Sequence, residues 1–142
     1  MSGILVGVDG SGHSQRALEW AAKEAGLRHT SLTVLTVHQA VAGFWGGTLH
    51  YQGDDTLIDQ ARDAAQAETD KVLATLGDAR PASVRVEAVQ GIPAEEIINA
   101  AADADMIVLG SRGGGGFARQ LMGSVSTQVA QHAKVPVLVM PA

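Results

Sequence analysis

The amino-acid sequence predicts an α/β domain in which a five-stranded parallel sheet carries helices on both faces. Five short segments rich in apolar and β-branched residues are typical of strands, and segments with helical spacing of apolar residues alternate with them. The 142 residues suit one domain, residues 1–142, and 46% hydrophobic residues suffice for a core. Because crossovers between parallel strands are right-handed, the alternation favours a doubly wound, flavodoxin-like topology.

The predicted strands are short and bounded by turn residues. The first is the apolar run GILVGV, which stops at DGSG and is typical of a strand buried on both faces. The five predicted strands are residues 3–8, 31–38, 83–89, 105–110 and 135–140. An irregular loop is expected over residues 40–53, and a loop of this length is either functional or mobile. The alternative is that its aromatic residues, Phe44, Trp45 and Tyr51, pack back on the core.

Four helices are predicted between these strands. The first has Ser14 as its expected N-cap, and its apolar residues are Ala17, Leu18, Ala21, Ala22 and Ala25. The second spans about 54–76, followed by Gly77 at the C′ position, and its stripe is Leu57, Ala61, Ala65, Val72 and Leu76. Pro93 opens the third helix, and the fourth runs from about 124 to 133.

Composition limits the classes of partner. The net charge of −5 disfavours nucleic acid, because phosphate-backbone binding needs a basic surface, and no apolar run reaches the length of a membrane span. The absence of cysteine excludes disulfides and thiolate metal sites. The first residues lack a basic segment followed by a long apolar one, so we expect no signal peptide and a cytoplasmic location.

The stretch GSRGGGGFARQLMGSVS, from Gly110 to Ser126, is rich in glycine directly after the fourth strand. Six glycines fall between Gly110 and Gly123. Without Cβ atoms, successive N–H groups can converge on an anion, and a following helix N-terminus adds donors and partial positive charge. This pattern indicates a phosphate chain as the ligand. The alternative is a flexible tether between strand and helix.

Two strand ends therefore carry candidate ligand contacts. Asp9, Gly10 and Ser11 follow the first strand, and the glycine-rich stretch follows the fourth. Open α/β sheets bind ligands beyond the carboxyl ends of their strands, at the switch point in strand order, so we expect these two strands to be neighbours. A P-loop is excluded because the chain has no Gly-Lys pair, and GVDGSG has the wrong spacing for a dinucleotide fingerprint.

The spacing Gly110-x-x-Gly113, nine residues, then Gly123-Ser124 resembles the nucleotide-binding signature of ATP-binding universal stress proteins. The resemblance covers nearly the whole chain and includes the segments GVDGS, LTVLTV, GIPAEEII, DMIVLGSRG and KVPVLVM. It implies a nucleotide-linked stress-response module that binds ATP. It also implies a homodimer whose terminal strands, residues 135–140, lie antiparallel across a two-fold axis, and an inner or naturally short strand is the alternative.

The resemblance also implies which residues contact the nucleotide. Val37 meets the adenine, Gly110 and Gly113 line ribose and phosphates, and residues 123–126 cap the phosphates. The implied set is Asp9, Gly10, Ser11, Val37, Gly110, Arg112, Gly113, Gly123, Ser124, Val125 and Ser126.

Asp9 poses an electrostatic problem, because a carboxylate repels phosphates unless a cation intervenes. Magnesium held mainly by the phosphates, with Asp9 nearby, resolves the repulsion. The alternative is that Asp9 only caps the turn through Ser11 or the next helix. The five histidines show no metal-ligand spacing.

The sequence offers little support for catalysis. No Walker lysine and no clear water-positioning base is present, so slow ATP hydrolysis or phosphoryl transfer is the less favoured reading and no catalytic residue is assigned. Nothing in the residues decides among ATP, AMP and cyclic AMP.

Overall fold

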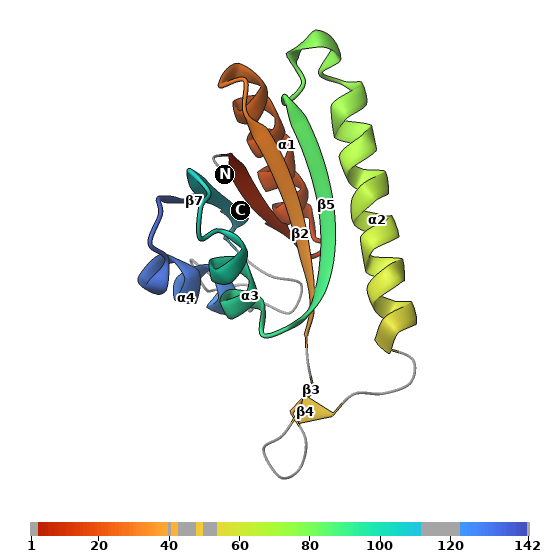
Figure 1. The fold of residues 1–142 in the computed structure, drawn as a ribbon, viewed down its shortest axis with the longest axis vertical. Coiled ribbons are helices and arrows are strands. Elements are labelled where there is room, and N and C mark those ends of the chain that lie inside the picture. The colour runs from red at the N-terminus through yellow and green to blue at the C-terminus, as the bar shows by residue number, and fades with distance from the viewer. Residues whose placement is uncertain (1–2, 40, 43–47, 50–53, 112–122, 142) are drawn as a thin grey trace.

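A computed structural model describes residues 3–39, 41–42, 48–49, 54–111 and 123–141, and its centre is one five-stranded sheet (Figure 1). The strand order is β5-β2-β1-β6-β7, and every pairing in this sheet is parallel. The strands are β1 Ile4–Val8, β2 Ser31–Gln39, β5 Ser83–Gly91, β6 Met106–Gly110 and β7 Val137–Met140. Two short strands, β3 Val41–Ala42 and β4 Thr48–Leu49, form a separate antiparallel pair.

The predicted fold class is confirmed, and so is the expected pairing of the first and fourth predicted strands. β1 pairs with β6 over Ile4↔Met106 to Val6↔Val108. The switch point lies between these two strands, because β2 and β5 are added on one side of β1, and β6 and β7 on the other. The order differs from that of flavodoxin, in which the first strand lies between the second and third. Here β5, the third strand of the sheet in chain order, lies at the edge beyond β2. It pairs with β2 from Ser31↔Ser83 to Gln39↔Gly91.

Two helices cover each face of the sheet (Figure 1). α1 Gly12–Leu27 and α2 Asp54–Ala74 lie on one face, and α3 Pro93–Ala100 and α4 Ser124–His132 on the other. Alternation along β1 supplies both cores: Ile4, Val6 and Val8 belong to the cluster with α1 and α2, and Leu5 belongs to the cluster with α3 and α4. Burial on both faces explains the continuous apolar run of this strand.

The second helix shows one wrong prediction. Leu57 was expected in the apolar stripe, but it is 47% exposed, whereas Thr69 and Leu73 are buried. The stripe therefore occupies only the later turns of α2, where Thr69 satisfies its hydroxyl by donating to the Ala65 carbonyl at 2.7 Å. Gly77 has a left-handed φ of +54°, as a helix-ending glycine requires, and begins the short 3-10 helix Gly77–Ala79.

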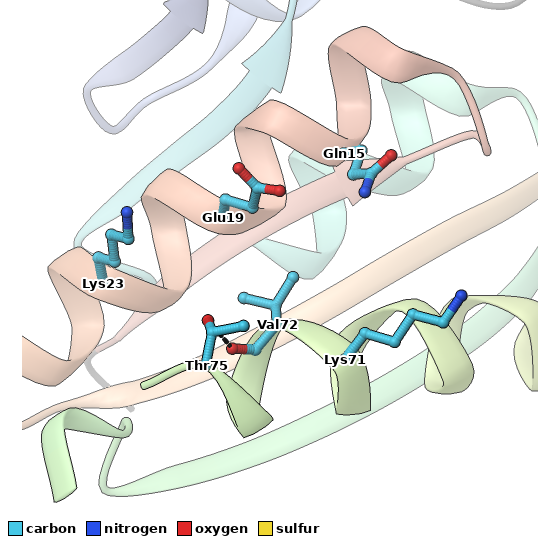
Figure 2. Close-up of a pocket in the computed structure, with 6 residues that line it drawn as sticks. All are labelled: Gln15, Glu19, Lys23, Lys71, Val72 and Thr75. Atoms are coloured by element: carbon cyan, nitrogen blue, oxygen red, sulfur yellow. Dashed lines mark hydrogen bonds between the residues drawn. The ribbon is translucent and has the colours of Figure 1, made fainter. Parts of the chain in front are cut away.

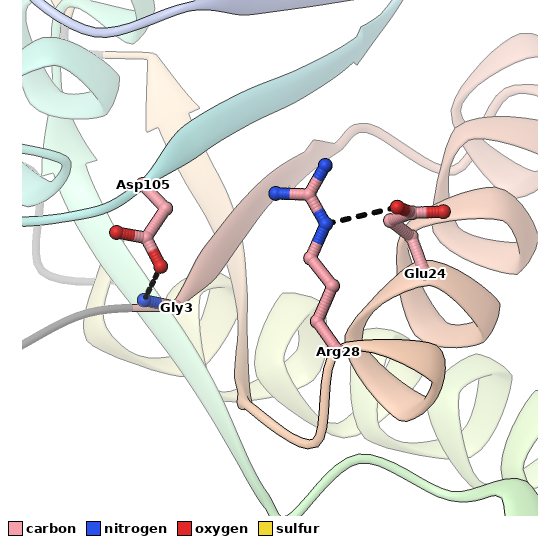
Figure 3. A network of polar contacts seen from close by, with 4 residues as sticks. All are labelled: Gly3, Glu24, Arg28 and Asp105. Carbon is pink, nitrogen blue, oxygen red and sulfur yellow. Dashed lines mark hydrogen bonds and ion pairs between the residues drawn. The ribbon is translucent and has the colours of Figure 1, made fainter.

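The amino ends of β1 and β6 are joined by two hydrogen bonds between one pair of residues (Figure 3). Gly3 N donates to Asp105 Oδ2 at 3.0 Å, and Asp105 N donates to Gly3 O at 2.7 Å. Nearby, Arg28 Nε donates to Glu24 Oε1 at 2.9 Å at the end of α1. These two hydrogen bonds between Gly3 and Asp105 help to fix the register of β1 against β6. The register in turn sets how the carboxyl ends of the two strands lie relative to each other.

Gly26 allows α1 to pack closely on the segment after α2. A Cβ on this residue would overlap the backbone carbonyl of Ala79, whereas a Cβ on Gly12 would meet nothing within 4 Å. We expect Gly26→Ala to destabilise the protein by about 1–3 kcal/mol, because a backbone carbonyl cannot yield as a flexible side chain can. Chemical denaturation measures the effect.

Gly12→Ala is the matched control, and it should be neutral or stabilising by up to about 1 kcal/mol. Equal stability of the two variants would contradict the close packing at Gly26.

Candidate ligand site at the carboxyl ends of β1 and β6

Two helix N-termini meet at the carboxyl end of β6. A Cβ on Gly110 would lie 2.9 Å from the backbone carbon of His13, so the first turn of α1 is in backbone contact with the end of β6. The Ser111 carbonyl accepts a hydrogen bond from Gly123 N, which brings the start of α4 to the same place. Helix N-termini present unpaired N–H groups and partial positive charge, so this edge attracts anions.

The turn before α1 is closed by its own side chains. Asp9 Oδ1 accepts from Ser11 N at 2.9 Å, and Ser11 Oγ accepts from Ser14 N at 3.2 Å. Ser11 is thus the N-cap, and the prediction of Ser14 was wrong because the helix begins at Gly12, three residues earlier than an N-cap at Ser14 implies. Ser14 is buried instead, and its Oγ accepts from Asp9 N at 3.2 Å and donates to Ser11 O at 3.1 Å.

Asp9 therefore has the turn-capping contact that the sequence offered as an alternative, and the residue is exposed. Gly10 beside it has φ +83°, a conformation that other residues rarely adopt, and no atom lies within 4 Å of an added Cβ. Among the described residues, no group of three His, Cys, Asp or Glu side chains could hold a metal. A single exposed carboxylate fits a magnesium ion that arrives with phosphates, and it does not fit a resident metal centre.

The start of α4 combines an exposed serine with a buried one. Gly123 is the N-cap residue and is buried, Ser124 is exposed, and Val125 is half-buried. Ser126 is 2% exposed, and its Oγ donates to Gly123 O at 3.0 Å, with Ser111 O 3.4 Å away. Ser126 therefore holds the first turn of α4 through an internal hydrogen bond, whereas Ser124 is exposed.

The remaining predicted contacts are only partly placed. Val37 is half-buried in β2, one residue beyond Thr36, which lies opposite Val8 of β1. Val37 is thus level with Asp9 across the sheet. Arg112 and Gly113 lie outside the described residues, as do Gly114 to Gly116.

Ser111 was missed by the sequence reasoning. It is 3% exposed at the end of β6, and its Oγ has no hydrogen-bond partner among the described residues. A serine that directly follows the glycine at a strand end was the available signal, but a sequence cannot show that such a hydroxyl is buried.

A cavity of about 390 Å³ lies elsewhere, between α1 and α2 (Figure 2). Its lining residues are Gln15, Glu19, Lys23, Lys71, Val72 and Thr75. Since none of these residues belongs to the predicted ligand contacts, the cavity is a surface feature separate from the carboxyl ends of β1 and β6.

A doubly wound sheet with two helix N-termini gathered at its switch point defines an α/β domain with an anion-attracting edge. Within that class, the chain belongs to the universal stress protein family, whose family model, Usp, matches residues 1–141. None of the described helices has the length and hydropathy that crossing a bilayer requires.

Individual relatives agree with this assignment. A universal stress protein of Mycolicibacterium smegmatis is 36% identical over 138 residues, which are 96% of this chain and 47% of that protein. The chain thus spans about half the length of the curated relatives it matches. UspA from Lactobacillus plantarum superposes with a TM-score of 0.79 at 27% identity, covering 98% of this chain and 97% of that one. A universal stress protein solved in complex with cAMP has a TM-score of 0.67 at 25% identity, covering 99% and 95%.

The Ser11 cap allows a test of the turn that carries Asp9. Ser11→Ala removes the acceptor for Ser14 N, so we expect a loss of about 0.5–2 kcal/mol in the free energy of unfolding. Ser11→Asp keeps an acceptor at the cap and should retain stability near that of the wild type. Urea denaturation measures both, and a Ser11→Ala protein as stable as the Ser11→Asp protein would show that the cap contributes nothing.

Proposed function

We propose that this chain binds an adenine nucleotide, with ATP as the first candidate, at the carboxyl ends of β1 and β6 and acts as a nucleotide-linked stress-response module. The observation that carries the proposal is the meeting of the α1 and α4 N-termini at the end of β6. Both helices direct partial positive charge to one edge, which suits a phosphate chain. The spacing of Gly110, Gly113 and Gly123-Ser124 supports the same ligand.

The polar contacts divide the proposed roles among the residues. The exposed Ser124 and the first N–H groups of α4 serve the phosphates, and the open space beside Gly10 lets a ligand approach the β1 turn closely. Asp9 lies in the same turn, exposed to solvent, so a magnesium ion carried by the phosphates would be attracted to its carboxylate. Val37 offers an apolar contact for the base, one strand away from β1.

A nucleoside monophosphate is the second candidate. The solved universal stress protein with cAMP, which is 25% identical to this chain, supports an adenine nucleotide and favours testing the smaller ligands beside ATP. We propose binding without catalysis, since the sequence has no Walker lysine and no clear water-positioning base.

Calorimetric titration tests the proposal with ATP and magnesium, AMP and cAMP in separate experiments. We expect binding by the wild type and a loss of at least about tenfold in affinity for Gly123→Leu. Gly123 is buried against Ser111, so a large side chain there displaces the first turn of α4.

Gln128→Leu is the matched control, because it adds the same side chain on an exposed position of the same helix. Circular dichroism checks that both variants fold. Absence of wild-type binding at millimolar nucleotide would overturn the proposed function.

We also propose that β7 pairs with the β7 of a second copy. β7 is an edge strand that pairs with β6 alone in the described sheet, which removes the alternative of an inner strand. It is short, at four residues, but all four are apolar and only half-buried. An uncovered apolar edge strand favours pairing with another chain.

The hydrogen bonds identify the free side of β7. Ile107 N donates to Pro136 O at 2.9 Å, and Ser111 N donates to Met140 O at 2.9 Å. Backbone groups of alternate residues point to opposite sides of a strand, so those of Val137 and Val139 point away from β6. These two residues offer the backbone groups for a second strand.

Val139→Pro tests the pairing because it removes one outward N–H and spares the bonds to β6. We expect the variant to be monomeric in analytical ultracentrifugation while Val139→Ala, which keeps the N–H, remains dimeric. A dimeric Val139→Pro protein, or a monomeric wild type, would rule out dimerisation through this edge.

A further inference from the structure

The hydroxyl of Ser111 is the one polar group of this residue that the fold leaves unused. Its backbone N–H donates to Met140 O at 2.9 Å, and its carbonyl accepts from Gly123 N, with Ser126 Oγ 3.4 Å away. The side-chain Oγ is buried and has no partner within the described part of the chain. Backbone hydrogen bonds therefore hold Ser111 to β7 and to α4, while its side-chain hydroxyl has no partner among the described residues.

An unpaired buried hydroxyl is unfavourable, because it has lost its hydrogen bonds to water without replacing them. Alanine would fill the same position without that loss. A serine here accordingly indicates that the hydroxyl gains a partner when the protein binds something.

The position of Ser111 identifies the chemistry of that partner. Ile107 and Leu109 belong to the cluster beneath α3 and α4, so alternation along β6 places the Ser111 side chain on the same face. The Ser111 carbonyl contacts the N-cap residue of α4, so the hydroxyl lies close to the positive end of that helix. A partner at this point is best an anionic oxygen that accepts hydrogen bonds.

We propose that Ser111 Oγ donates a hydrogen bond to a phosphate oxygen of the bound nucleotide. The proposal rests on the proposed nucleotide-binding function and adds a phosphate contact from inside the fold to those from the exposed start of α4. Because Ser111 is held on both sides by backbone hydrogen bonds, its hydroxyl is positioned before the ligand arrives and little conformational entropy is lost on binding.

The experiment compares Ser111→Ala with the wild type in two measurements. Thermal denaturation without ligand should show no fall in Tm for Ser111→Ala, because the removed hydroxyl has no partner in the free protein. Calorimetry should show AMP and magnesium-ATP binding weakened by about tenfold to a hundredfold, as for a hydrogen bond to a charged group. Adenosine, which lacks phosphate, should bind both proteins equally.

Ser126→Ala is the contrasting variant, because its hydroxyl is already bonded to Gly123 O at 3.0 Å in the free protein. We expect it to lower the Tm without ligand, unlike Ser111→Ala.

Three results would overturn the assignment of Ser111. One is a lower ligand-free Tm for Ser111→Ala, which would mean that the hydroxyl serves the fold. The others are unchanged AMP and ATP affinities, or an equal loss for adenosine. Each of these requires that the wild type binds nucleotide, so they are distinct from failure of the proposed function, in which the wild type itself binds none.

Discussion

The backbone contact between the end of β6 and the first turn of α1 is the constraint on which the candidate ligand site depends. At Gly110 there is room for a hydrogen atom and no more, since a Cβ would lie 2.9 Å from the His13 backbone. This contact brings the N-terminus of α1 over the switch point between β1 and β6. A larger residue would move α1 away from the end of β6. The N-termini of α1 and α4, with their partial positive charges, would then no longer lie close together. Gly110 thus has a packing reason that is independent of any ligand.

The hydrogen bonds around this contact leave few groups uncommitted. In the turn from Asp9 to Ser14, side chains and backbone satisfy one another, so the turn is rigid without a ligand. At the start of α4, Ser126 does the same for the Gly123 carbonyl. Ser124 is exposed at the start of α4, and the Ser111 hydroxyl has no partner among the described residues. A preorganised set of donors loses little entropy on binding, which favours a small anionic ligand over one that reshapes the edge.

The fold was predictable because its main signals are local. Apolar runs, β-branched residues and turn residues mark β1, β2 and β6 clearly, and the alternation of elements requires a parallel sheet. The wrong predictions concern features that depend on the three-dimensional position of a helix. Leu57 has the right spacing for the core, but α2 reaches the core only in its later turns. Ser14 and Ser11 are both good capping residues, and only the start of the helix at Gly12 distinguishes them.

The sequence predicted that the candidate residues at the ends of β1 and β6 lie on neighbouring strands, but it did not predict their contacts. Because ligands collect at the switch point, the ends of β1 and β6 could be selected from residue types alone. The sequence could not show that Ser126 is engaged inside α4, that Gly110 faces α1, or that the Ser111 hydroxyl is buried, because each depends on contacts between distant segments.

One residue, Ser111, joins the edge strand β7 to the start of α4. Ser111 N donates to Met140 O at the end of β7, while the Ser111 carbonyl accepts from Gly123 N at the start of α4. A displacement of β7 on pairing would act on the same residue that contacts the start of α4. By thermodynamic reciprocity, whatever factor assembly contributes to ligand affinity, ligand must contribute to assembly. With the proposed dimer and the proposed ligand, the subunit equilibrium would therefore respond to ligand concentration.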